Sequence, residues 1–200
     1  MRFILGSSSP ARLKVLRTAG LDPQVVVPDV DERSVREKKP RTLVARLAEA
    51  KAIAALARTD TSAPGLLLAC DSMLEFDGKA VGKPADAADA RARWKALRAH
   101  RGTLHTGHCL TRLPDGATRT AVASTLVVFA DVSDAEIDAY VATGEPLSVA
   151  GAFTIDGYGG AFIESIAGDP SNVIGVSLPL LRAMATDLGV AWTDLWSARG

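Results

Sequence analysis

A short uninterrupted apolar run at residues 65–70, GLLLAC, most constrains the fold of this chain. Turn-forming residues bound the run, and it lacks the alternation of apolar and polar residues that a half-solvated strand shows. Such a run is typical of a central strand that is buried on both faces. It therefore predicts an α/β fold with a covered sheet.

Strand and helix signals alternate on both sides of this run. In the first half, we expect strands at residues 2–6 and 24–27, helices at 10–20 and 42–56, and a further helix capped by Asp86. The second half is richer in strand signals, because residues 103–113 and 118–130 flank a Pro-Asp-Gly turn and predict an antiparallel pair. A capping box at Ser133 and Glu136 begins the next helix. A strand at 161–166 and a helix at 179–188 follow.

The composition describes one globular domain. The 200 residues are 48% hydrophobic, and 23 basic residues balance 23 acidic ones, which predicts a single domain over residues 1–200 with two lobes. No run of about 18 apolar residues occurs, and the first residues have the pattern of a strand instead of a signal peptide. We therefore expect a cytoplasmic protein with no membrane partner. Balanced charge argues against a nucleic-acid partner but permits a small anionic ligand.

Cysteine and histidine spacings give no sign of a metal site. Cys70 and Cys109 match no CxxC pattern, and we expect both to be buried. His105 and His108 lie three positions apart within one expected strand. Because side chains alternate along a strand, the two rings are predicted on opposite faces and would not share a metal.

The start of the chain has the pattern of an anion cradle. The strand at residues 2–6 runs into three serines, Pro10 and a helix that carries Arg12 in its first turn. Ser9 is expected to cap the helix, which leaves free backbone N–H groups and the Ser7 and Ser8 hydroxyls directed at one point. Arg12 opposes the helix dipole unless an anion binds there. The alternative is an ordinary capped turn followed by a surface arginine.

Two further polar residues stand where apolar ones are expected. The apolar stripe of the helix at residues 42–56 passes through Lys51, which must either extend its ammonium to solvent or meet an anion. Asp71 follows the apolar run directly, so we expect it at a strand end, where α/β sheets place ligand chemistry; the alternative is a simple turn. A hairpin around Asp77 and Gly78 then returns Lys83 toward Asp71.

Together these residues indicate a site for a polyphosphate held with a divalent cation. Three cations and a helix start surround Asp71 and the acidic pair Asp31 and Glu32. The charged segment at residues 33–41 is expected to be a solvated, mobile connection, or else a segment that closes over a ligand.

Eight ordered motifs in this chain are similar to those of the Maf family of nucleoside triphosphate pyrophosphatases. They are GSSSPARLKVLRTAG (6–20), VDE (30–32), AKA (50–52), ACDS (69–72), GKP (82–84), HTGH (105–108), AGAFTIDGYGG (150–160) and GDPSNVIGVSLPLL (168–181). The resemblance implies a mixed α/β fold like that of the inosine triphosphatases, with a curved sheet, flanking helices and a central cleft. It also implies a homodimer.

The resemblance implies a reaction as well. Water would attack the α-phosphorus of a nucleoside triphosphate, standard or modified, and release pyrophosphate in a house-cleaning role. By similarity, Asp71 is the catalytic proton acceptor and, with Glu32, the ligand of Mg²⁺ or Mn²⁺. Ser8, Arg12, Lys51 and Lys83 are the phosphate-binding residues. The alternative functions are a nucleotide-binding regulator of septum formation that does not hydrolyse its ligand, and an unrelated phosphatase that releases orthophosphate.

The expected base-specificity positions differ from both branches of the family to which the resemblance points. The branch acting on dTTP and UTP has Arg, Thr and Gln where this chain has Ala11, Ser72 and Asp156. The branch acting on 7-methyl-GTP has an aromatic residue, Gln and Glu. A carboxylate at Asp156 suits the N–H groups of a guanine edge, or else it belongs to an ordinary Asp-Gly turn, so the preferred base stays open.

Overall fold

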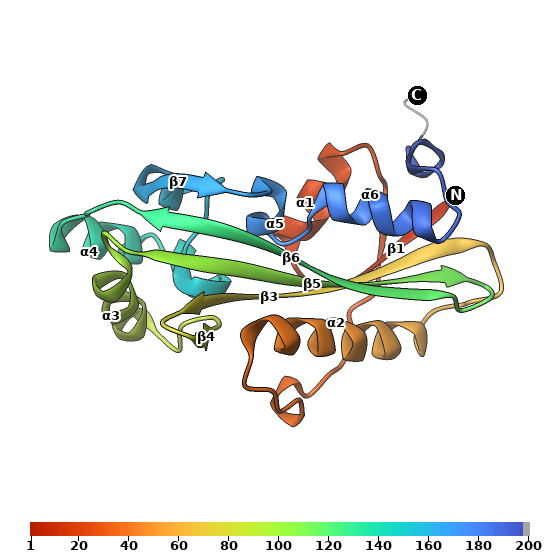
Figure 1. Cartoon of the computed structure of the whole chain (residues 1–200), viewed down its shortest axis with the longest axis horizontal. Helices are drawn as coiled ribbons and strands as arrows, with labels where there is room; N and C mark the ends of the chain where they lie inside the picture. Colours follow the sequence, from red (N-terminus) through yellow and green to blue (C-terminus); the bar gives the residue numbers. More distant parts are fainter. Residues whose placement is uncertain (198–200) are drawn as a thin grey trace.

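The structure is a computed structural model that describes residues 1–197, and it is built on a mixed seven-stranded sheet (Figure 1). The strands are β1 (Arg2–Gly6), β2 (Gln24–Val25), β3 (Gly65–Phe76), β4 (Lys79–Val81), β5 (Arg101–Leu113), β6 (Thr118–Phe129) and β7 (Ile163–Ala167). Their order is β2-β1-β3-β5-β6-β7, with β4 paired to β3. β1 is parallel to β2 and β3, whereas the other pairings are antiparallel. The predicted mixed α/β fold is confirmed.

Helices cover both faces of this sheet, as Figure 1 shows. The helices are α1 (Pro10–Thr18), α2 (Pro40–Leu56), α3 (Ala87–Leu97), α4 (Asp134–Ala142), α5 (Pro170–Ile174) and α6 (Leu178–Asp187). α2 lies on one face, and α1, α5 and α6 lie on the other, while α3 and α4 pack at one end of the long strands (Figure 1). No helix within residues 1–197 is long and apolar enough to cross a membrane.

The apolar run in β3 explains this layering. Leu66, Leu68 and Cys70 are buried in the core beneath α1 and α6, whereas Leu67 and Ala69 are buried against α2. Because successive side chains point to opposite faces, a run without polar residues requires cover on both sides. The prediction of a doubly buried central strand is confirmed. A third core surrounds Trp94 between α3, α4 and the far ends of β5 and β6.

The local signals for helix starts are also confirmed. The Ser9 hydroxyl accepts a hydrogen bond from Arg12 N, and Pro10 occupies the first helical position of α1. Ser133 and Glu136 form the predicted capping box of α4. α2 begins at Pro40, two residues earlier than expected, because proline fits the first turn of a helix.

Several strand boundaries differ from the prediction. β2 ends at Val25 and not at residue 27, and β7 covers residues 163–167 and not 161–166. The difference that concerns the site is in β3. The strand does not stop at residue 70, because β3 continues without a break to Phe76. Its ladder with β5 runs from Gly65 opposite Leu113 to Glu75 opposite Thr103. Asp71 therefore lies in the middle of a long strand, opposite Gly107, and not at a strand end.

The last described residues pack against the end of α1. A 3₁₀ turn, η5 (Trp192–Leu195), precedes Trp196, whose ring lies against Gly20 at the end of α1. Ser197 N donates to Gly20 O. This segment thus packs on its own chain. The predicted domain of residues 1–200 includes three residues, 198–200, that lie outside the described part.

Candidate active site

A cleft of about 690 Å³ lies beside the middle of β3. The start of α1 and the segments η1 (Glu32–Ser34) and α2 contribute one part of its lining, and the turns around residues 148–156 contribute another. The cleft contains every residue that the sequence predicted for the site. These are Ser8, Ala11, Arg12, Glu32, Lys51, Asp71, Ser72, Lys83 and Asp156.

The floor of the cleft holds a chain of three charged groups. Lys51 Nζ lies 2.5 Å from Asp71 Oδ1 and 2.7 Å from Glu32 Oε1. The side chains of Lys51 and Asp71 are only 13% and 7% exposed. The anion expected beside Lys51 is thus supplied, in this structure, by two carboxylates of the same chain. An ammonium has three donors, so one of them is left for a ligand.

Burial raises the pKa of Asp71 above its ordinary value, although Lys51 and Arg12 act against this shift and Glu32 adds to it. Asp71 Oδ2 is buried and has no hydrogen-bond partner within residues 1–197. A carboxylate with a raised pKa and an unpaired oxygen accepts a proton more readily than an ordinary aspartate does.

Arg12 connects α1 to the floor of the cleft. Its Nη1 donates to Cys70 O at 2.8 Å and to Ser7 Oγ at 3.2 Å, and its Nε donates to Gly175 O at 3.0 Å. Its Nη2 donates to Ser72 Oγ at 3.1 Å. Four of the five guanidinium N–H groups therefore already have acceptors within the chain, and one is left to reach a ligand.

Ser8 and Lys83 complete the polar part of the lining. Both are exposed, and Lys83 follows β4, as the predicted hairpin requires. Within residues 1–197, Lys83 forms no ion pair, in contrast to Lys51. It is therefore a cation whose charge is available to an anionic ligand.

A further part of the cleft lining is apolar. It is lined by Leu104, Val149, Ala150, Phe153, Ile155, Val173 and Ile174. At its rim, Asp156 Oδ2 lies 3.3 Å from Lys14 Nζ of α1, so an exposed ion pair joins the two sides. Ser72 accepts from Arg12 and shares a hydrogen bond with Thr106. The lining thus combines a charged floor with apolar side chains, two of which, Val173 and Ile174, directly precede the Gly175 that accepts from Arg12.

The two carboxylates on the floor fit a divalent cation that also binds phosphate. Within residues 1–197, no group of three or more His, Cys, Asp or Glu side chains is placed to hold a metal. Mg²⁺, however, is commonly held by one or two carboxylates together with substrate phosphates and water. Glu32 and Asp71 both contact Lys51, and the buried Oδ2 of Asp71 has no hydrogen-bond partner within residues 1–197.

The two histidines of β5 contact different parts of the structure. His108 Nε2 accepts from Ser177 N at 2.9 Å, and its Nδ1 donates to Thr106 O at 3.0 Å. Burial lowers the pKa of His108 to about 4, so the ring is neutral at pH 7. His105 instead contacts Glu75 and Ser124.

Sequence reasoning missed the residues that shape the apolar part of the lining. Val173 and Ile174 come from α5, a five-residue helix that was not predicted. The signal was present, because Asp169 caps this helix and Pro170 occupies its first position. Glu145, which holds the turn at residues 157–160, was also missed, because no local pattern marks it.

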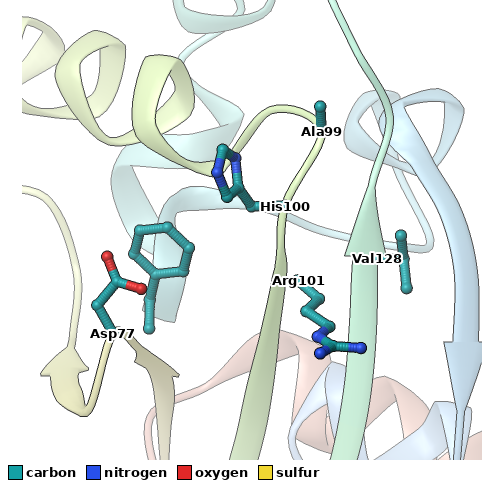
Figure 2. Close-up of a pocket in the computed structure, with 6 residues that line it drawn as sticks. Asp77, Ala99, His100, Arg101 and Val128 are labelled. Atoms are coloured by element: carbon teal, nitrogen blue, oxygen red, sulfur yellow. The ribbon is translucent and has the colours of Figure 1, made fainter.

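A second hollow of about 380 Å³ lies between the β3–β4 turn and the start of β5 (Figure 2). Figure 2 shows Asp77 on one side and Arg101 on the other, with His100 above them. None of the predicted site residues lines it. It therefore has no part in the chemistry expected from the sequence.

The sequence of this chain is similar to those of known proteins of one family. The sequence profile of a family described as "Maf-like protein" matches residues 2–188. A protein of Streptomyces coelicolor named nucleoside triphosphate pyrophosphatase is 53% identical over 98% of this chain and 95% of its own length. Proteins with the same name from Streptomyces avermitilis and Cutibacterium acnes are 52% and 48% identical, over 99% and 98% of this chain and 96% and 94% of their own lengths. A solved structure described as that of the Staphylococcus aureus Ham1 protein aligns over 98% of this chain and 94% of that chain, with 13% identity and a TM-score of 0.44.

Proposed function

The chain belongs to the Maf-like protein family, and from this membership we propose that it is a nucleoside triphosphate pyrophosphatase. The observation that carries the proposal is the pairing of Lys51 with Asp71 on the floor of a cleft that also contains Arg12 and Lys83. Fixed cations beside a buried carboxylate suit a reaction in which a polyphosphate is cleaved. The names of its relatives support the same activity.

In the proposed reaction, a water oxygen forms a bond to the α-phosphorus, and the bond from that phosphorus to the bridging oxygen breaks. The water's proton goes to Asp71, and the electron pair of the broken bond leaves with pyrophosphate. The raised pKa of Asp71 supports its role as the base. The remaining donors of Lys51 and Arg12, together with Lys83 and Ser8, would stabilise the charge on the phosphates.

We propose that Mg²⁺ or Mn²⁺ takes part, held by Glu32 and Asp71. When bound, such an ion neutralises phosphate charge and acidifies a coordinated water. The two acids meet at the Lys51 ammonium, so the chain itself already supplies one cation between them, and a divalent ion would bind beside Lys51. Carboxylate oxygens are the ligands that Mg²⁺ prefers, which supports the assignment of Glu32 and Asp71 as the residues that would hold it.

The apolar part of the cleft lining is proposed to bind the nucleobase, with Ala11, Ser72 and Asp156 setting its identity. The side chain of Asp156 only accepts hydrogen bonds when ionised, whereas Lys14 beside it only donates. Guanine offers both an acceptor and two donors on the matching edge. We therefore place guanine nucleotides ahead of pyrimidine nucleotides as substrates.

Further expectations from the sequence stay proposals. These are a homodimer, a cytoplasmic location, no nucleic-acid partner, and a house-cleaning role in removing unwanted nucleotides. Balanced charge supports the expectation that the protein has no nucleic-acid partner. Sedimentation at several protein concentrations would show whether the protein is a homodimer.

A product assay tests the proposed activity. The purified protein is incubated with GTP, 7-methyl-GTP, UTP, dTTP and CTP in the presence of Mg²⁺ or Mn²⁺, and pyrophosphate and orthophosphate are measured separately. Pyrophosphate as the first product supports the proposal, whereas orthophosphate as the first product contradicts it. If no nucleotide yields either product but one binds, the protein is the non-hydrolysing regulator.

An Asp71→Asn variant sharpens this test. Because a neutral amide does not accept the water's proton, the rate of pyrophosphate release should fall by about 10²- to 10⁴-fold. Binding of the triphosphate should persist, since Lys51, Arg12 and Lys83 are unchanged. Full activity in this variant would remove Asp71 from the chemistry.

A further inference from the structure

The carboxylate of Glu145, at the start of η2 (Glu145–Ser148), collects four hydrogen bonds from neutral donors. Its Oε1 accepts from Thr154 Oγ1 at 2.6 Å, from Tyr140 Oη at 2.9 Å and from Gly159 N at 2.9 Å. Its Oε2 accepts from Tyr158 N at 2.9 Å. Within residues 1–197, no lysine or arginine forms an ion pair with it. Three of the four donors belong to the single segment of residues 154–159.

The glycines of this segment are required by close contacts with Glu145 and Tyr140. A Cβ at Gly157 would lie 2.2 Å from Glu145 Oε2, and one at Gly159 would lie 2.5 Å from Tyr140 Oη. The turn GYGG therefore folds directly over the Glu145 and Tyr140 side chains. The segment continues into the 3₁₀ turn η4 (Tyr158–Phe162) and is held by hydrogen bonds at residues 158 and 159.

The other end of the arrangement is anchored in the core. The Tyr140 ring packs edge-on against Trp94 and Phe162, with ring centroids 5.3 and 5.5 Å away. Burial raises the pKa of Tyr140 above its ordinary value, so its hydroxyl stays a donor to Glu145. A rigid aromatic cluster thus fixes one oxygen of the carboxylate.

The segment held by Glu145 continues directly into the cleft. Thr154, Ile155 and Asp156 line the cleft, whereas Glu145 does not. Any movement of residues 157–159 would therefore move the Ile155 and Asp156 side chains of the lining. The cationic floor is built on α1, α2 and β3, so it does not depend on this carboxylate.

We propose that Glu145 is a positioning residue for the nucleobase-binding part of the cleft, which acts by holding residues 154–159 from behind. This inference rests on the proposed function, because it assumes that a nucleotide occupies the cleft. A glutamine at this position cannot replace the carboxylate. Its oxygen could occupy the place of Oε1, but its amide nitrogen would then face the N–H of Tyr158, donor against donor.

Steady-state kinetics of Glu145→Gln test the inference, using whichever nucleotide of the panel the wild-type protein cleaves best. Loss of hydrogen bonds to a charged acceptor should raise KM about tenfold, with kcat within about twofold, because binding of the base is weakened and the phosphate chemistry is not. The Ki of inorganic tripolyphosphate, which has no base, should stay unchanged. A fall in kcat at constant KM, or an equal rise in the tripolyphosphate Ki, would overturn the inference.

Two further variants keep the test decisive. Tyr140→Phe removes only one of the four donors, so it should raise KM less than Glu145→Gln does, and it carries the test if the latter does not fold. Asp138→Asn is the matched control, because Asp138 lies on α4 near Tyr140 but pairs only with Arg91 at the surface. Its KM should equal that of the wild type. If the wild-type protein releases no pyrophosphate from any nucleotide, the proposed function fails instead of this inference.

Discussion

Gly107 lies directly opposite Asp71 in the β3–β5 ladder, and the backbone of α2 passes immediately above it. A Cβ at Gly107 would lie 2.1 Å from Val44 O, far closer than any real contact. The absence of a side chain therefore allows α2 to lie against the sheet. Lys51, further along α2, can then reach Asp71.

Gly107→Ala should accordingly disturb both stability and activity. The methyl group must push α2 away from β5, which should lower the free energy of unfolding by about 1–3 kcal/mol. Urea unfolding measures this change. Gly82→Ala is the stability control, because the nearest atom there is the flexible Met73 Sδ at 3.4 Å. A stability loss as large in Gly82→Ala as in Gly107→Ala would show that close packing under α2 is not the cause.

The raised pKa of Asp71 has a defined sign in the pH dependence of stability. A carboxyl that holds its proton more tightly in the folded state makes the fold less stable as pH rises from its ordinary value of 3.8 through the raised value. The amide of an Asp71→Asn variant does not titrate. The stability of this variant relative to the wild type should therefore increase as pH rises through this window, and then stay constant. Urea unfolding at several pH values would contradict this assignment if the difference ran the other way.

The same shift predicts where activity is lost in acid. The proposed base works only when it is ionised, so kcat/KM should decrease as pH falls. The midpoint of this decrease should lie above 3.8, the ordinary pKa of an aspartate. A pH profile of pyrophosphate release measures this limb. An acidic limb at or below 3.8 would mean that the carboxyl is not buried in the working enzyme.

Lys83 offers a test of charge in the polar part of the cleft lining. Lys83→Ala removes a cation without an ion-pair partner in residues 1–197 and should lower kcat/KM by about 10- to 100-fold. Lys79→Ala removes the same charge from β4, on the same hairpin but outside the lining. It should retain nearly full activity. Equal losses in the two variants would indicate a general effect of surface charge instead of a phosphate contact.

Replacement of Asp156 is expected to change the preference between substrates. Asp156→Asn replaces a side chain that only accepts hydrogen bonds with one that also donates, so the ratio of kcat/KM for GTP to that for UTP should fall about tenfold. The exposed ion pair with Lys14 contributes little to stability, so unfolding should be almost unchanged. Asp22→Asn, which breaks another exposed pair at the other end of α1, should leave the ratio as it is.

Local interactions explain which parts could be predicted. The caps at Ser9 and Ser133 depend on hydrogen bonds spanning three residues, and the burial of residues 65–70 follows from their own composition. Lys51 was recognised as unusual for the same kind of reason, because helical periodicity placed it on an apolar stripe. Such features depend only on residues within one short segment, so they can be predicted from the sequence.

Only the tertiary structure decided what these residues meet. Asp71 lies within a strand because β5 pairs with β3 on both sides of this residue. The residues near position 71 do not indicate this pairing. Arg12 is held by Gly175, 163 residues away, and Glu145 holds a turn through backbone N–H groups that have no sequence signature. The sequence by itself determined the elements and the chemical groups available. Their partners were decided by packing, because hydrogen bonds between distant segments exist only once the sheet and its helices have assembled.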